Sequence, residues 1–135
     1  MDNFKERLKD IKAFVFDVDG VFSENIILNP DGELTRFMNV KDGFAVKTAV
    51  DKGFIIGIIT GGNSESVRMR FNGLGVTDIY LKSHNKIEDY EDFYMKYNLN
   101  PEQILYMGDD VPDYEPMKAS GLATCPSDAV EEIQN

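Results

Sequence analysis

Five short apolar runs along the chain are separated by segments with helical periodicity. The runs are nearly continuous rather than alternating with polar residues, which is typical of parallel strands buried on both faces; they cover residues 14–16, 55–59, 79–81, 104–107 and 122–124. Amphipathic segments that end near a glycine or a proline predict helices at residues 45–51, 64–71, 87–97 and 114–119. This alternation predicts an α/β fold with a Rossmann-like, doubly wound parallel sheet.

Residues 25–40 interrupt the alternation. A Pro30-Asp31-Gly32 turn lies between two strand-like arms, so we expect a β-hairpin inserted at about residues 24–40. Both arms are rich in large apolar residues, namely Ile26, Ile27, Leu28, Leu34, Phe37 and Met38. Such a hairpin needs a surface on which to bury one face, and we therefore expect the protein to assemble with copies of itself.

The length and composition narrow the class of protein. A chain of 135 residues with 42% hydrophobic residues is expected to form one domain, residues 1–135, with a core that needs no disulfide. The net charge of -10 argues against nucleic acid or an anionic membrane as a partner. Cys125 is the only cysteine, and the charged start of the chain does not resemble a signal peptide, so we expect a cytoplasmic protein.

Polar side chains follow four of the predicted strands. In open α/β sheets the loops at the carboxyl ends of the strands converge on the ligand, so these side chains are expected to meet at one edge. The first strand is followed by two carboxylates and a glycine (Asp17, Asp19 and Gly20), and the second by a threonine and a glycine (Thr60 and Gly61). The third is followed by a lysine (Lys86), and the fourth by a second acidic cluster (Asp109, Asp110 and Asp113). The ordered set predicts a metal site that handles phosphate.

With these motifs the chain resembles the haloacid dehalogenase (HAD) superfamily of phosphotransferases over nearly its whole length. The likeness is carried by residues 17–21, 37–43, 59–61, 85–86 and 108–113. It is greatest to a branch without a cap domain, which contains 3-deoxy-D-manno-octulosonate 8-phosphate phosphatases, nine-carbon keto-acid phosphatases, and phosphatase-like domains attached to sialic-acid cytidylyltransferases. The resemblance implies an HAD-like fold in which the short hairpin stands where larger relatives carry a cap.

The resemblance also implies a role for each acidic residue. Asp17 would be the nucleophile, forming an aspartyl-phosphate that water then hydrolyses. Asp19 would be the general acid and base. Mg²⁺ would be held by the Asp17 carboxylate, the Asp19 backbone carbonyl and Asp109. Asp110 and Asp113 would lie next to these groups and hold them in position.

Other residues are implied to bind the substrate. Thr60 and Gly61 with Lys86 would hold the transferring phosphoryl group, and Arg70 matches a recurrent arginine that serves the subunit interface or a substrate carboxylate. The implied activity is Mg²⁺-dependent hydrolysis of a phosphorylated keto-sugar acid, either 3-deoxy-D-manno-octulosonate 8-phosphate or a nine-carbon analogue. In this branch the hairpin often packs within a tetramer, so a homotetramer is expected.

Plainer interpretations exist for several of these residues. Thr60 could cap a helix, and Asp19 could cap a turn. Lys82 and Arg68 are expected to be solvated surface residues, and His84, the only histidine, is expected in a loop near the substrate.

Departures from the family pattern bear on substrate choice. Gly62-Asn63 stands where the sugar-acid phosphatases commonly place a charged residue, and Ser23 replaces the usual threonine. Relatives continue beyond the position of Asn135 into a glycine-rich tail, and we expect that tail to be short or missing here.

Two other classes of protein share part of this pattern. A phospho-acceptor receiver domain uses similar groups, but its acceptor aspartate lies on a later strand than its acidic pair, whereas the Asp-x-Asp motif comes first here. The alternative within the superfamily is a non-catalytic or weakly active oligomerising domain associated with a sialic-acid-type cytidylyltransferase. The presence of Asp17, Asp19, Lys86 and Asp109 argues against this alternative.

Overall fold

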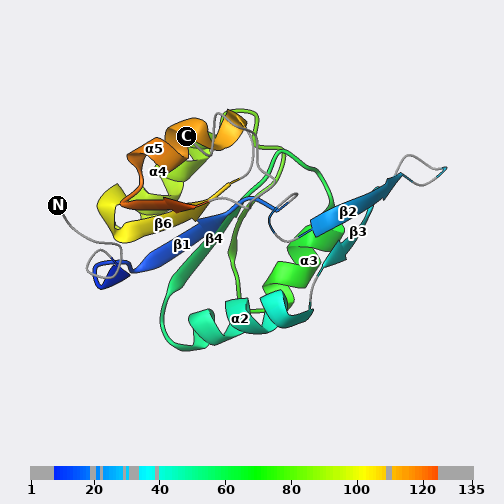
Figure 1. Ribbon diagram of the computed structural model, residues 1–135, viewed down its shortest axis with the longest axis horizontal. Coiled ribbons are helices and arrows are strands. Elements are labelled where there is room, and N and C mark those ends of the chain that lie inside the picture. The colour runs from blue at the N-terminus through cyan, green and yellow to red at the C-terminus, as the bar shows by residue number, and fades with distance from the viewer. Residues whose placement is uncertain are drawn as a thin grey trace.

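The chain folds around a five-stranded parallel sheet in a computed structural model that describes residues 8–18, 21, 23–28, 30, 34–38, 40–108 and 111–124 (Figure 1). The strands are β1 (Ala13–Phe16), β4 (Ile55–Ile59), β5 (Asp78–Tyr80), β6 (Ile104–Met107) and β7 (Leu122–Thr124). Their order is β5-β4-β1-β6-β7, so the chain is wound outwards in both directions from the central β1. This confirms the predicted doubly wound sheet, with each strand within one residue of its predicted bounds.

Two pairs of helices cover the sheet. The pair α2 (Val40–Asp51) and α3 (Glu65–Gly73) packs on one face, where Val46 and Phe71 contact Ile58 in a buried apolar cluster. The pair α4 (Lys86–Lys96) and α5 (Tyr114–Ala119) packs on the other, where Phe93 and Met117 join Val15. Two short 3₁₀ helices, Pro101–Gln103 and Val111–Asp113, were not predicted.

Helix α2 begins five residues before its predicted start at Ala45, because Gly43 does not break it. Gly43 is buried, and a Cβ there would collide with the guanidinium of Arg70 and lie 3.7 Å from Leu74 Cδ1. Glycine in a helix interior costs about 1 kcal/mol relative to alanine. Here it allows α3 to pack closely on the first turn of α2. The residues near Gly43 in the sequence do not predict this packing.

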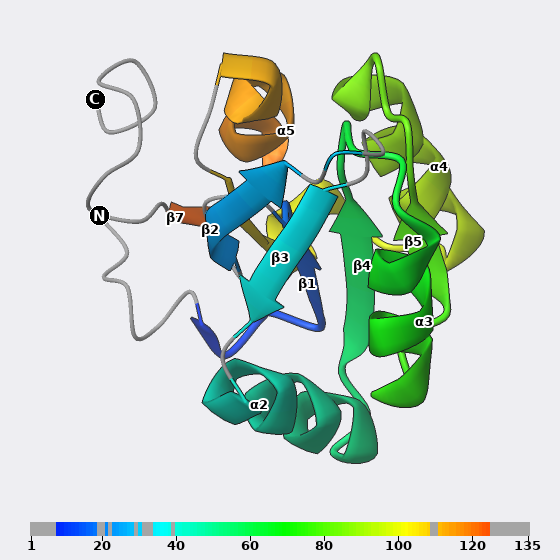
Figure 2. The same cartoon turned by 90° about the vertical axis from the view of Figure 1, so that its right-hand side faces the viewer.

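The expected hairpin is present as β2 (Ser23–Leu28) and β3 (Leu34–Met38). The two strands pair antiparallel with a register shift between Ser23 and Ile26, and they form a separate two-stranded sheet. The hairpin extends away from the five-stranded sheet (Figure 1), and it lies in front of that sheet in the view of Figure 2. The predicted end at residue 40 is too long, because Val40 already belongs to α2.

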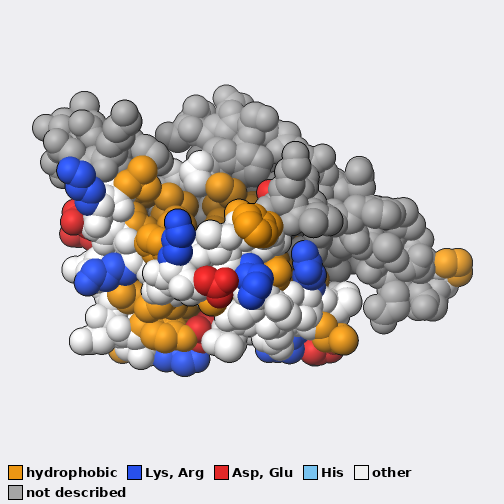
Figure 3. All heavy atoms as spheres, turned by 90° about the horizontal axis from the view of Figure 1, so that it is seen from below, with side chains coloured by type: hydrophobic (Ala, Val, Ile, Leu, Met, Phe, Trp, Pro, Cys, Tyr) orange, Lys and Arg blue, Asp and Glu red, His pale blue; other side chains and the backbone are white. Residues whose placement is uncertain are grey.

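An apolar cavity of about 320 Å³ lies between α2 and the sheet. Phe14 and Phe16 line it from β1, and Ala45 and Ala49 line it from α2. Among the described residues that line it, Asp42 alone is charged. Figure 3 shows the α2 side of the molecule, where hydrophobic side chains are exposed among basic and acidic ones. No helix in the described part of the chain is long and apolar enough to cross a membrane.

Candidate active site

Asp17 stands at the centre of the carboxyl edge of the sheet. It directly follows β1, the middle strand, and only 6% of it is exposed. Its backbone N–H donates to the Met107 carbonyl at 3.0 Å, and its Oδ1 accepts from the N–H of Val18 at 2.8 Å. The end of β6 is thereby joined to the residue that follows β1, as the parallel register of Phe16 with Met107 requires.

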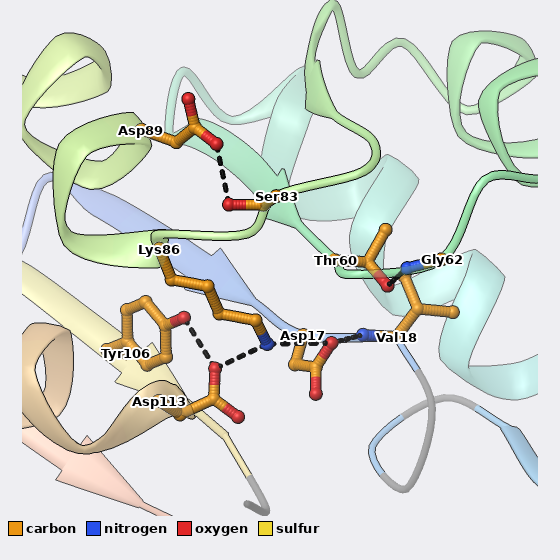
Figure 4. A network of polar contacts seen from close by, with 9 residues as sticks. All are labelled: Asp17, Val18, Thr60, Gly62, Ser83, Lys86, Asp89, Tyr106 and Asp113. Atoms are coloured by element: carbon orange, nitrogen blue, oxygen red, sulfur yellow. Dashed lines mark hydrogen bonds and ion pairs between the residues drawn. The ribbon is translucent and has the colours of Figure 1, made fainter. Parts of the chain in front are cut away.

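Lys86 reaches this position from the first residue of α4. Its side chain is 6% exposed, and its Nζ lies 2.8 Å from Asp113 Oδ1 and 3.3 Å from Asp17 Oδ1 (Figure 4). One ammonium therefore connects the loop after β1 with the end of the second 3₁₀ helix, 27 residues further along the chain than Lys86. The prediction that Lys86 and Asp17 meet at one edge of the sheet is confirmed.

The two carboxylates keep Lys86 charged. Burial alone would lower the pKa of the Lys86 ammonium, but the charges of Asp17 and Asp113 outweigh it and hold the pKa above its ordinary value. Two carboxylates and one ammonium leave this cluster with a formal charge of -1. The cluster can therefore accept further positive charge, and its carboxylate oxygens are the donors that Mg²⁺ prefers.

Asp113 is fixed more firmly than the sequence indicated. Its exposure is 0%, and its Oδ1 accepts from the hydroxyl of Tyr106 at 2.7 Å as well as from Lys86. Gly108 makes room for it, since a Cβ at that position would lie 2.5 Å from Asp113 Cγ. Sequence reasoning did not identify Tyr106; the available signal was a tyrosine inside a buried strand, whose hydroxyl needs a partner.

Thr60 lies at the end of β4 and is buried. Its Oγ1 accepts from the N–H of Gly62 at 3.2 Å, whereas the N-cap of α3 is Ser64. The alternative of Thr60 as a helix cap is therefore wrong, and the threonine stabilises a turn instead. Figure 4 shows Thr60 beside Val18, on the side of the site opposite Asp113.

The loop after β4 is tied to the loop after β5. The N–H of Ser83 donates to the Thr60 carbonyl at 2.9 Å, and the N–H of Lys82 donates to the Gly62 carbonyl at 2.8 Å. The hydroxyl of Ser83 in turn donates to Asp89 on α4 at 2.6 Å. These bonds fix the threonine loop relative to the start of α4, which carries Lys86. The sequence contained no periodic signal for them.

Other expected residues lie outside this cluster. Arg70 is exposed, and its guanidinium lies over Gly43 of α2, so its expected role with substrate stays a prediction. Arg68 pairs with Glu65 at 3.3 Å on the surface of α3, and Lys82 is exposed. His84 is also exposed and lines a pocket next to Lys86.

Three of the predicted acidic residues, Asp19, Asp109 and Asp110, lie outside the described residues. The strand that leads to Asp109 ends beside Asp17, as the bond from Asp17 to Met107 shows. In the part of the chain that the structure describes, no three side chains of histidine, cysteine, aspartate or glutamate are grouped as a metal site. The expected Mg²⁺ ligands therefore stay a prediction that rests on Asp17 and its sequence motif.

Comparison with known proteins gives a consistent result. No family model matches the chain. The chain is 32% identical over 129 residues to the 3-deoxy-D-manno-octulosonate 8-phosphate phosphatase of Yersinia pestis, a match that covers 95% of this chain and 69% of that protein. It thus spans about two thirds of the length of the curated relatives it matches.

Solved structures show the same likeness. A putative 3-deoxy-D-manno-octulosonate 8-phosphate phosphatase from Vibrio cholerae superposes with a TM-score of 0.91 at 36% identity, covering 96% of this chain and 73% of that one. The corresponding phosphatase from Moraxella catarrhalis superposes with a TM-score of 0.90 at 30% identity, covering 95% of this chain and 74% of that one. The latter structure is a complex with magnesium ion, phosphate ion and KDO.

Proposed function

Because the chain belongs to the 3-deoxy-D-manno-octulosonate 8-phosphate phosphatase family of the HAD superfamily, we propose that it is a Mg²⁺-dependent phosphatase of a keto-sugar acid phosphate. The observation that carries this proposal is the buried contact of Lys86 Nζ with Asp17 Oδ1 at 3.3 Å, at the carboxyl edge of the sheet. A carboxylate beside a fixed ammonium is the arrangement that attack on a phosphate ester requires, because the ammonium offsets the repulsion between two anions.

The proposed reaction has two steps. In the first, a carboxylate oxygen of Asp17 bonds to phosphorus, the bond from phosphorus to the sugar oxygen breaks, and Asp19 gives its proton to that oxygen. In the second, Asp19 takes a proton from water, the water oxygen bonds to phosphorus, and the bond to Asp17 breaks. The products are inorganic phosphate and the free sugar acid.

Lys86, Thr60 and Gly61 position the phosphoryl group in this proposal. The Lys86 ammonium contacts both Asp17 and Asp113, and these contacts fix its position. It can therefore donate to phosphoryl oxygens without a change of conformation. The Thr60 hydroxyl accepts one bond from Gly62 and can still donate its proton to a phosphoryl oxygen. Both groups act where negative charge develops in the transition state.

Asp17, Asp19 and Asp109 are the residues that would hold Mg²⁺, and Asp110 and Asp113 would support them. When bound, the ion supplies positive charge at the phosphoryl oxygens and at Asp17. The net negative charge of the Asp17, Lys86 and Asp113 cluster supports this assignment, because the site is not neutralised by its own lysine.

The proposal is tested by hydrolysis of 3-deoxy-D-manno-octulosonate 8-phosphate with Mg²⁺, with EDTA, and with the Asp17→Asn variant. We expect release of phosphate only from the wild-type protein with Mg²⁺, and loss of about a thousandfold or more in the variant, which lacks a charged nucleophile. Activity that survives Asp17→Asn would remove Asp17 from the mechanism. Inactivity of the wild-type protein toward a panel of sugar-acid phosphates would favour a non-catalytic domain.

The length of the substrate is a separate question. The similarity to 3-deoxy-D-manno-octulosonate 8-phosphate phosphatases supports the eight-carbon ester, whereas the uncharged Gly62-Asn63 pair leaves the nine-carbon analogue as the alternative. A direct comparison of kcat/KM for the two esters decides between them, and a preference for the nine-carbon ester would exclude the eight-carbon assignment.

We also propose a homotetramer in the cytoplasm, built from a single domain of residues 1–135. A two-stranded hairpin is marginally stable by itself, and β2 and β3 extend away from the main sheet (Figure 1), so packing against another copy would stabilise them. Light scattering at micromolar concentration tests the assembly, and a monomer would exclude it.

A further inference from the structure

The carboxylate of Asp113 is held by two donors that come from different elements. Its Oδ1 accepts from the Tyr106 hydroxyl of β6 at 2.7 Å and from the Lys86 ammonium of α4 at 2.8 Å. Tyr106 and Asp113 are both 0% exposed. The Lys86 ammonium lies farther from Asp17, at 3.3 Å. The position of the ammonium beside Asp17 therefore depends on Asp113, and the position of Asp113 depends on the tyrosine that donates to it.

Tyr106 lies beneath the site rather than in it. In the register of β6 with β1 it pairs with Val15, two residues before Asp17. Its ring packs edge-on against Tyr90 at a centroid distance of 5.5 Å, inside the apolar cluster under α4 and α5. Figure 4 shows its hydroxyl approaching Asp113 from the side away from Asp17. Any effect of this hydroxyl on the reaction therefore passes through Asp113.

The Tyr106 hydroxyl is a constant donor. Burial, together with the charge of Asp113, raises the pKa of Tyr106 far above its ordinary value of 10.0, so the hydroxyl keeps its proton. A carboxylate oxygen with two donors divides its negative charge between them. Without the hydroxyl, the same oxygen would attract the Lys86 ammonium more strongly and draw it away from Asp17.

A buried tyrosine hydroxyl usually finds a partner whether or not it serves a reaction. Tyr90 provides the comparison within the same apolar cluster, because its hydroxyl contacts Ser120, the residue that follows α5. The partner of Tyr106 differs in kind, since Asp113 directly contacts Lys86. The two tyrosines therefore separate a contact that only completes the core from one that bears on the site.

We propose that Tyr106 is a positioning residue for phosphoryl transfer: its hydroxyl holds Asp113 so that the Lys86 ammonium stays within reach of Asp17 and of the phosphoryl group. This inference rests on the proposed function and adds a buried residue to it. Tyr106 contacts neither the substrate nor the reacting atoms in this proposal, and it acts through Asp113 and Lys86.

The first test is the steady-state kinetics of Tyr106→Phe, which keeps the ring and removes only the hydroxyl. The substrate is 3-deoxy-D-manno-octulosonate 8-phosphate with Mg²⁺. We expect kcat to fall about tenfold, the effect of losing one hydrogen bond to a charged group. KM should change by less than about twofold, because the position of the ammonium matters most where charge develops in the transition state. A wild-type kcat, or an effect on KM alone, would overturn the proposal.

Tyr90→Phe is the matched control. It removes a hydroxyl from the same apolar cluster, but the lost partner is Ser120 rather than Asp113. We expect both variants to melt at a lower temperature than the wild-type protein, and Tyr90→Phe to keep kcat within about twofold of it. An equal fall of kcat in the two variants would attribute the effect to general packing and would overturn the proposal.

The second test measures binding without turnover. Orthovanadate adopts the five-coordinate geometry of a phosphoryl group during transfer, and inorganic phosphate does not. In calorimetric titrations with Mg²⁺, Tyr106→Phe should weaken the binding of orthovanadate about tenfold and that of inorganic phosphate by less than about twofold. Tyr90→Phe should change neither. Equal affinity of the wild-type protein and Tyr106→Phe for orthovanadate would contradict a positioning role.

These measurements distinguish the failure of this inference from the failure of the proposed function. If the wild-type protein hydrolyses no sugar-acid phosphate, the proposed function fails, and the role of Tyr106 fails with it. If the wild-type protein is active and Tyr106→Phe keeps both its kcat and its affinity for orthovanadate, the role of Tyr106 alone fails.

Discussion

At the scale of single residues, the Lys86 ammonium is the group on which the site depends most. It is buried, and it touches the carboxylates of Asp17 and Asp113, which come from opposite ends of the chain. Removal of one member of a buried charged group leaves the others without compensation, which usually costs about 3–5 kcal/mol. The stability of the fold and the chemistry of the site therefore depend on the same side chain.

Lys86→Met should destabilise the protein by about 3 kcal/mol in urea unfolding, because two buried carboxylates lose their counter-charge. Phosphatase activity should fall by about a hundredfold or more, since a transition-state cation is lost. Lys82→Met is the control and should change stability by less than about 0.5 kcal/mol, because Lys82 is exposed. Near-normal activity in Lys86→Met would exclude the phosphate-binding role.

Tyr90 should make the protein less stable at alkaline pH. Burial raises the pKa of Tyr90 from 10.0 to about 12, while its hydroxyl contact with Ser120 at 2.5 Å acts in the opposite direction. Below pH about 10 the tyrosine is protonated in both states, and between about 10 and 12 it ionises first in the unfolded chain. The free energy of unfolding should therefore fall by about 2–3 kcal/mol over this range on account of Tyr90 alone.

Urea unfolding followed by circular dichroism measures this effect, since the chain has no tryptophan. Tyr90→Phe should lose less stability between pH about 9 and about 11.5 than the wild-type protein. A residual decrease is expected from Tyr106, whose pKa is also raised, by burial and by the charge of Asp113. Equal pH dependence in the two proteins would contradict the assignment to Tyr90.

At the scale of elements, the site depends on how closely β6 approaches the 3₁₀ helix Val111–Asp113. Gly108 directly follows β6 and lies beside Asp113, whose side chain occupies the space that a Cβ of residue 108 would take. Tyr106, on the same strand, donates to the carboxylate so placed. One strand thus provides both the space for Asp113 and a hydrogen bond to it.

Gly108→Ala should displace Asp113 from Lys86, because the added methyl group would lie 2.5 Å from Asp113 Cβ. We expect a loss of stability of about 1–3 kcal/mol from overpacking and a loss of activity of about tenfold or more. Gly73→Ala is the matched control, since nothing lies within 4 Å of the added group, and it should be neutral or slightly stabilising. Full activity in Gly108→Ala would show that the position of Asp113 does not matter.

At the scale of the whole molecule, the strand order brings distant segments to one edge. Central β1 lies between β4 and β6, so Asp17 is flanked by the loops that carry Thr60 and Gly108. With a net charge of -10 and a buried cluster of charge -1, binding of a divalent cation is expected to stabilise the folded chain as a whole.

Mg²⁺ should therefore raise the melting temperature of the protein. At a concentration about a hundred times the dissociation constant, the expected gain is about 2.7 kcal/mol, or a few degrees. Asp17→Asn should abolish this gain. Asp78→Asn should retain it even if the variant is less stable, because Asp78 begins β5, the outermost strand on one side of the sheet, and pairs with Lys96 there. An undiminished gain in Asp17→Asn would place the cation elsewhere.

Hydrophobic pattern and motif order were sufficient to predict the strands and the gathering of Asp17, Thr60 and Lys86 at one edge. The apolar runs show where the strands end, and the carboxyl ends of parallel strands lie at the same edge of the sheet. Residues that directly follow these strands are therefore expected to lie close together. The same reasoning missed Tyr106 and began α2 too late at Ala45, because both depend on contacts with residues far along the chain: Asp113 for the tyrosine, and Arg70 for Gly43 inside the helix.

The sequence by itself determined the class of fold, the acidic chemistry of the edge and the lysine that faces it, since these depend on local periodicity and residue type. Only the tertiary structure decided that Asp113 is buried behind Lys86, that Thr60 stabilises a turn rather than a helix, and that His84 lines a pocket. The reason is physical: local pattern fixes which face of an element is apolar, whereas the partner of a buried polar group is fixed by packing between elements.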